Sequence, residues 1–527
     1  MAASPTHPTG GYLTPQERDA RWRVSESRYD PAREKWLQRV TAGGLAGPFR
    51  PDWTSLQEYR SPKWYDEARF GIFIHWGVYS VPAFGSEWYS RNMYKEGSPE
   101  YQHHRDTYGP QDRFGYKDLI PLFKADKFDA RAWARLFREA GARYVVPVAE
   151  QHDGFAMYDS QLSGWTAAKM GPKRDVLGEL RTAIREEGLH FGVSSHRAEH
   201  NWFFDLGRRV PSDVNDPSNA SLYGPAQDHI AMKADADLDD DWTYVAPAWL
   251  DDWLARTAEL VTRYEPELVY FDWWVGHPAF RNTVPKFLAY YYNQGATRGG
   301  VVVDYKLGGF APNAGTLDIE RGQLTDIQER VWQTDTSISN ESWGYVEHDT
   351  YKAPAAIIHL LADVVSKNGN LMLNVGPRAD GTIPEEAQKT LREVGAWLKV
   401  NGEAIYASKP WTRFGEGPTA VAGGSLQETN TKPFTAEDFR FTTRQGHLYA
   451  IELGWPDNGE ALIRSITRQT LVCQVRLLAS GEIIPFTQDA DGLHLMLPRK
   501  RPGQHAWVYR IETKDLSATA AGKRTPG

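Results

Sequence analysis

The stretch Glu267-Leu-Val-Tyr-Phe-Asp272-Trp-Trp decides how the rest of the chain is interpreted. Its unbroken apolar run predicts a strand that is buried on both faces, which is typical of a parallel sheet. The run ends abruptly in an acid that two tryptophans follow. Because an ionised carboxylate is costly to bury without a partner, Asp272 is expected to line a pocket at the end of the strand. Parallel α/β folds place their reactive groups at this carboxyl end.

Similar apolar strands alternate with amphipathic helices from Phe70 to about Val400. One such helix is predicted to begin after its cap, Asp129, and to end at Gly141. Strands separated by helices pair in parallel, and this many units favour a closed (β/α)8-like TIM barrel over an open sheet. The predicted strands are 70–76, 143–150, 190–195, 268–271, 301–305 and 370–376.

The pattern changes after Trp411, where helical periodicity gives way to short alternating runs separated by Gly, Pro, Asn and Asp. These runs predict a C-terminal antiparallel β-sandwich. In the N-terminal segment, one short charged helix is expected around residues 31–40. The predicted division is a polar N-terminal extension (1–50), a catalytic barrel (51–410), a β-sandwich (411–513) and a disordered tail (514–527).

Composition limits the possible functions. The 527 residues are 41% hydrophobic and 24% charged, as in an ordinary globular protein. A net charge of −8 argues against nucleic-acid binding. No apolar stretch approaches the ~20 residues that span a bilayer, and no secretory signal pattern is visible. We therefore expect a cytoplasmic protein without a membrane partner, or a secreted one if the N-terminus is processed; the oligomeric state is not indicated.

Two loops that follow predicted strands carry candidate binding groups. His75 closes the first strand, and Glu87 and Trp88 lie in the loop after it. An adjacent acid and indole ring offer a hydrogen-bond acceptor and a stacking face, which suits a sugar. Gln151 and His152 follow the next strand, and the imidazole can donate to a ligand hydroxyl.

A third loop, Ser195-His196-Arg-Ala-Glu199-His200, fits the H-x-x-E-H pattern of inverted zinc proteases. That chemistry needs both histidines on one face of a helix. Here the segment leaves a strand end, which favours a polar rim loop. We therefore predict no metal ligands, and a zinc hydrolase is kept as a rival hypothesis.

A pair of carboxyl groups could perform glycoside hydrolysis. A retaining glycosidase needs one carboxylate as the nucleophile and a second carboxyl about 5–5.5 Å away as the acid. Asp272 suits the nucleophile, and the acid candidates are Asp304, Asp318, Glu320 and Asp335. We favour Glu320 because a glycine-flanked loop carries it after the next strand.

At these residues the chain resembles the family 29 α-L-fucosidases, from about Trp64 to Ile511. Several long segments match in the right order, which rarely arises by chance. The matching segments are 70–89, 151–155, 270–274, 332–335, 342–345, 368–377 and 401–406.

The resemblance implies retaining, exo-acting hydrolysis of terminal α-L-fucosides, with Asp272 as nucleophile and no cofactor. The implied partner is a fucosylated oligosaccharide or glycoside. Besides Glu320 as general acid/base, the candidate substrate-binding residues are His75, Glu87, Trp88, Gln151, His152, His196, Tyr270 and Trp343, the last near the sugar's methyl group.

Two positions depart from the family pattern. Gln151 stands where the family often has histidine, so one contact to the sugar would change from imidazole to amide. Gln333 replaces a glutamate that many members carry, which removes one acid candidate. A catalytically silent fucose-binding protein and a hydrolase of a related α-glycoside, such as an α-L-galactoside, are the alternatives.

Overall fold

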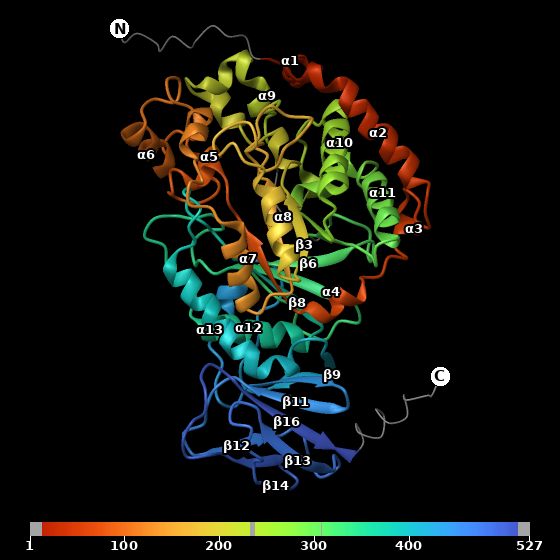
Figure 1. The fold of residues 1–527 in the computed structure, drawn as a ribbon, viewed down its shortest axis with the longest axis vertical. Coiled ribbons are helices and arrows are strands. Elements are labelled where there is room, and N and C mark those ends of the chain that lie inside the picture. The colour runs from red at the N-terminus through yellow and green to blue at the C-terminus, as the bar shows by residue number, and fades with distance from the viewer. Residues whose placement is uncertain (1–12, 232–237, 307, 515–527) are drawn as a thin grey trace.

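The computed structural model describes residues 13–231, 238–306 and 308–514. Within them, eight parallel strands form a closed barrel, and a smaller antiparallel domain follows it (Figure 1). The predicted fold class is confirmed. The barrel strands are β1 (Phe70–Ile74), β2 (Tyr144–Glu150), β3 (His190–Ser195), β4 (Leu268–Phe271), β5 (Val302–Tyr305), β6 (Thr316–Glu320), β7 (Trp332–Ser337) and β8 (Gly369–Val375).

Helices cover the outside of the barrel where the amphipathic patterns predict them. The side chain of Asp129 accepts the N–H of Ala132 at 2.9 Å and so caps a helix that buries Trp133 and Phe137. The described residues between β5 and β6, and between β6 and β7, contain no helix. The larger helices are α7 (Ala130–Glu139), α8 (Val176–Glu186), α10 (Pro247–Tyr264), α11 (Val284–Ala296), α12 (Pro354–Ser366) and α13 (Glu385–Asn401); the shorter ones are α3 (Trp53–Leu56), α4 (Lys63–Ala68), α5 (Tyr89–Asn92), α6 (Pro99–Thr107) and α9 (Ala220–Tyr223).

Two N-terminal helices, α1 (Pro15–Glu26) and α2 (Asp30–Gly44), occupy the segment predicted as a polar extension. α2 packs along α10 and α11 (Figure 1). Trp22 and Trp36 are buried, and the ring of Trp22 lies 5.0 Å from that of Trp249. Isolated tryptophans in a polar sequence give no clear periodicity, so the sequence predicts a single shorter helix here.

The C-terminal domain consists of two antiparallel sheets with a hydrophobic core between them. The five-stranded sheet has the order β13-β16-β11-β10-β9, and the three-stranded sheet has the order β12-β15-β14. Apart from Lys514, the predicted tail lies outside the described residues. The strands are β9 (Lys409–Glu416), β10 (Phe439–Arg444), β11 (His447–Glu452), β12 (Glu460–Ile463), β13 (Val472–Leu477), β14 (Phe486–Gln488), β15 (Leu493–Met496) and β16 (Trp507–Thr513).

A buried group of charges joins the two domains. Asp363 on α12 accepts from Lys367 at 2.6 Å and from Arg440 on β10 at 2.5 Å. All three side chains are almost fully buried. The barrel therefore meets the sandwich through a compensated ionic contact as well as through apolar packing.

Among the helices that the structure describes, none is both long and apolar enough to cross a bilayer.

Candidate active site

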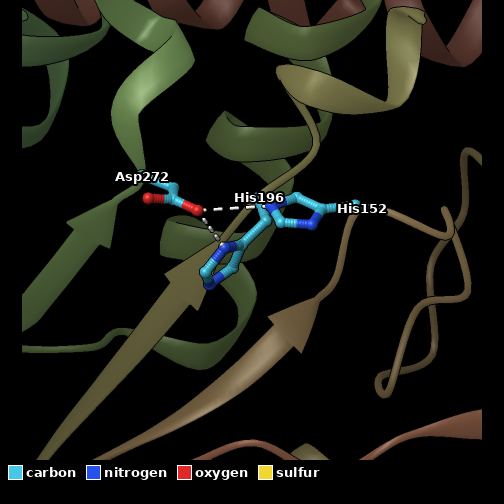
Figure 2. Close-up of side chains that lie close together, drawn as sticks. All are labelled: His152, His196 and Asp272. Carbon is cyan, nitrogen blue, oxygen red and sulfur yellow. Dashed lines mark hydrogen bonds and ion pairs between the residues drawn. The ribbon is translucent and has the colours of Figure 1, made fainter. Parts of the chain in front are cut away.

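Strand register brings three of the predicted side chains together. Ser195 of β3 pairs with Phe271 of β4, so His196 and Asp272 are the next residues at neighbouring strand ends. His152 follows closely after the end of β2, the strand on the other side of β3. Figure 2 shows the two imidazole rings converging on one carboxylate oxygen. The carboxyl ends of three adjacent strands thus build the centre of the site.

Asp272 is held as a carboxylate. His152 Nε2 and His196 Nδ1 lie 3.2 and 3.0 Å from its Oδ2, and the Trp273 N–H donates to Oδ1 at 2.9 Å. Burial alone would raise the pKa of Asp272, but the two imidazoles hold it well below its usual range. On the far side of the His196 ring, Ser194 Oγ lies 2.6 Å from Nε2, which leaves Nδ1 to donate to Asp272. These contacts suit an ionised nucleophile.

Replacing His196 with leucine is expected to move the acid limb of kcat/KM to higher pH. The variant loses one donor to Asp272, so the pKa of that carboxyl rises and it becomes protonated, and inactive, at a higher pH than in the wild type. The measurement is the pH profile of kcat/KM. Ser194→Ala removes only the hydroxyl that contacts His196 Nε2. It should therefore shift the acid limb of kcat/KM in the same direction by a smaller amount. An unmoved limb would contradict this role for His196.

Glu320 is the last residue of β6 and faces the same end of the barrel. Trp273 Nε1 donates to its Oε2 at 2.6 Å, while the backbone N–H of the same residue donates to Asp272, so Trp273 links the two acids. Burial raises the pKa of Glu320, and the nearby charge of Asp272 adds to this, while the Lys306 ammonium at 3.5 Å opposes it. The net shift is upward, which favours a protonated carboxyl beside an ionised one.

Lys306 was not predicted from the sequence. Its ammonium is buried and lies 2.7 Å from Asp318 and 2.9 Å from Asp335. Tyr270 donates its hydroxyl to the same Asp335 at 2.9 Å. Tyr270 therefore lies in the barrel interior, one layer beneath Asp272, since side chains two residues apart on a strand share a face. The position directly after β5 was the available signal for Lys306.

Glu87 holds the loop that carries Trp343. Its Oε2 accepts from Ser342 Oγ at 3.1 Å and from the Trp343 N–H at 3.0 Å. The Trp343 ring lies 5.3 Å from the ring of His75, whose Nδ1 is 2.8 Å from Asn374 Oδ1. The structure thus brings these predicted residues to the same region. There Glu87 accepts hydrogen bonds from the loop that carries Trp343.

A small cavity opens beside Asp272. Its walls combine predicted residues with Glu199, whose only signal in the sequence is its place in the zinc-protease pattern. Glu199 Oε1 accepts the Trp274 N–H at 3.0 Å, and burial raises its pKa to about 8. Aromatic walls with a few polar groups are typical of a small-ligand site. The lining residues are Trp88, His152, Glu199, Trp202, His229, Ala231, Leu238, Asp241, Asp272, Trp273 and Trp274.

The H-x-x-E-H segment does not form a helical metal motif. Residues Glu199–Asn201 make a short 3-10 turn, and His200 Nδ1 donates to the backbone oxygen of His152 at 2.7 Å. The ligand atoms of His152, His196 and Asp272 do lie within 4.8 Å of one another, a spacing that one metal ion can also use. Gln151 is buried beside them, and its Oε1 has no partner in the described part of the chain.

Comparison with known proteins identifies the family of the chain. The family model for α-L-fucosidase matches residues 37–403, and the model for the α-L-fucosidase C-terminal domain matches residues 431–512. The chain is 33% identical to tissue α-L-fucosidase of Rattus norvegicus (89% of this chain, 94% of that one) and 34% identical to that of Homo sapiens (88% and 91%). The crystal structure of Thermotoga maritima α-fucosidase superposes with a TM-score of 0.69 at 30% identity, covering 88% of this chain and all of that one. The chain belongs to the family 29 α-L-fucosidases, a family of glycoside hydrolases.

Proposed function

We propose that this α-L-fucosidase is a retaining, exo-acting enzyme that removes terminal α-L-fucose from oligosaccharides or other glycosides. The observation that carries the proposal is the pairing of a carboxylate held ionised, Asp272, with a carboxyl of raised pKa, Glu320. Trp273 links them, because its backbone N–H donates to Asp272 and its indole donates to Glu320. The Thermotoga maritima relative has been solved in complex with fucose, and a fucosynthase variant of it with a fucosyl-fucose azide. Both complexes support a fucoside as the substrate class.

In the first step, a carboxylate oxygen of Asp272 attacks C1 of fucose while the bond from C1 to the glycosidic oxygen breaks. Glu320 gives its proton to the departing oxygen, and a covalent fucosyl ester remains. In the second step, Glu320 takes a proton from water, whose oxygen attacks C1 and releases Asp272. Two inversions give net retention, and no cofactor takes part in either step.

The surrounding residues would orient the sugar. Trp88 and His152 line the cavity, so the indole can stack on the sugar and the imidazole can meet one of its hydroxyls. Gln151, the residue before His152, is buried, and its amide oxygen has no partner among the described residues. Tryptophan rings beside these few polar groups suit the binding of one sugar unit.

The proposal predicts that p-nitrophenyl α-L-fucoside is hydrolysed with α-L-fucose as the first-formed product. Proton NMR during the first turnovers, before mutarotation, measures the anomer. A β-fucose signal appearing first would contradict the double displacement. Equal kcat/KM for the matched α-L-galactoside would broaden the substrate class, and loss of activity with a chelator would favour the metal hydrolase instead.

A further inference from the structure

The connection between β9 and β10, residues 417–438, is unusually long and returns from the sandwich to the barrel. Loops of this length without regular secondary structure are uncommon inside compact domains and are usually functional. It lies mostly between the two family matches, which end at residue 403 and resume at residue 431. The connector contacts the loop that directly follows β6.

Backbone hydrogen bonds join this connector to the residue proposed as general acid. The Leu426 N–H donates to the backbone oxygen of Glu320 at 2.7 Å, and the Glu428 N–H donates to that of Arg321 at 2.9 Å. A third bond, at 2.8 Å, runs from the Gly424 N–H to Gln323. Three backbone N–H groups of the connector thus bond to carbonyl oxygens at the end of β6 and in the loop after it. The described residues of that loop contain no helix.

The connector and the loop after β6 are in close contact. A Cβ added to Gly322 would lie 1.9 Å from the carbonyl oxygen of Gly424, so only glycine fits there. Arg321 and Leu426 both have positive φ, at 42° and 60°. A non-glycine residue is held in this left-handed region only where its surroundings over-determine the conformation. Both strained residues flank the backbone of Glu320.

A side-chain anchor fixes the far end of the connector. Glu428 Oε2 accepts from Thr336 Oγ1 at 2.7 Å, and its other oxygen lies 3.6 Å from the Lys352 ammonium. Thr336 belongs to β7, the strand that pairs with β6. The connector is therefore tied both to the loop after Glu320 and to the neighbouring strand.

We propose that residues 424–428 are a positioning clamp, supplied by the C-terminal part of the chain, that fixes the backbone of Glu320 so that its carboxyl meets the leaving oxygen. This inference rests on the proposed role of Glu320 as general acid. Proton transfer requires the acid within hydrogen-bond reach, and a displacement of about 1 Å can cost about 100-fold in rate. The clamp should matter most where the leaving group needs its proton.

The test is a series of aryl α-L-fucosides whose phenols differ in acidity: dinitrophenyl, p-nitrophenyl and phenyl. In Gly322→Ala and Glu428→Ala, kcat/KM for the phenyl substrate should fall about tenfold or more, and for the dinitrophenyl substrate less than about threefold. Glu428→Gln keeps an acceptor for Thr336 and should recover most of the loss. Lys432→Ala, an exposed change in the same connector, is the matched control.

The outcomes separate the clamp from the acid assignment. An equal fall for every substrate in Glu428→Ala, with Glu428→Gln no better, would show a merely structural connector and overturn the inference. If Glu320→Ala itself shows no dependence on the leaving group, the proposed acid is wrong. If Glu320→Ala steepens the dependence and the clamp variants do not, only this inference fails. Thermal unfolding shows whether each variant is folded. If Gly322→Ala does not fold, the comparison of Glu428→Ala with Glu428→Gln tests the inference alone.

Discussion

Asp272→Asn is expected to lower kcat for p-nitrophenyl α-L-fucoside by about three orders of magnitude or more, the scale seen when a nucleophile is removed. An amide is a poor nucleophile, so the fucosyl ester cannot form at a useful rate. The fold should persist because asparagine has nearly the same size and shape, and its amide oxygen can still accept one of the two bonds that now reach Asp272, from His196 to Oδ2 or from the Trp273 N–H to Oδ1. The measurement is kcat beside the wild type, with thermal unfolding as the check on folding.

A smaller side chain at this position sharpens the result. Asp272→Gly leaves room for azide, which should attack C1 directly and give the β-fucosyl azide, the inverted product. Asp251→Asn, an exposed change on α10, is the matched control and should leave kcat unchanged. If Asp272→Asn kept more than about a tenth of the wild-type kcat, another group would have to be the nucleophile.

Glu320→Ala should lose about 10²- to 10⁴-fold in kcat/KM on substrates with a poor leaving group, the range that general acid catalysis contributes. The fucosyl ester still forms from an activated substrate, but its hydrolysis is slow because no general base activates the water. Azide needs no base, so it should restore turnover and give the α-fucosyl azide, with retention. Product NMR and the azide dependence of kcat are the measurements.

The two azide products make the pair of variants decisive, because opposite anomers are expected from the two faces of the sugar. Absence of rescue in Glu320→Ala would move the acid role to another carboxyl. Glu199 is then the first alternative, since it lines the cavity and burial raises its pKa to about 8. The corresponding Glu199→Ala variant would be tested in the same way.

Much of the barrel follows from local sequence. A buried parallel strand leaves an unbroken apolar run, and the first charged residue after it marks the carboxyl end, which is how Asp272 and His196 were located. Glu320 was expected on a glycine-flanked loop, whereas the structure makes it the last residue of β6; Asp318 interrupts the apolar run of that strand, so the sequence does not reveal it. The period of two along a strand would also have placed Tyr270 beneath the site, where its hydroxyl meets Asp335.

Other features depend on contacts between distant segments and leave no local trace. The bond from Leu426 to Glu320 joins backbone atoms, for which any residue type except proline would serve. Glu199 sits in a pattern that suggests zinc, and only the turn after β3 shows its carboxyl pointing into the cavity. Trp22 and Trp36 are buried, but they are too widely spaced to give a periodic pattern that predicts the N-terminal helices.

The ionic contact between α12 and β10 also constrains how such a protein can change its parts. A barrel joined to a different C-terminal module would keep Asp363 and Lys367 but lose the guanidinium of Arg440. Leaving a buried charge without a partner costs roughly 3–5 kcal/mol; here Lys367 still compensates Asp363, so the cost of losing Arg440 lies below that range. Recombination at this junction is therefore tolerated best when the incoming module brings its own cation to the same place, which favours the joint inheritance of barrel and sandwich.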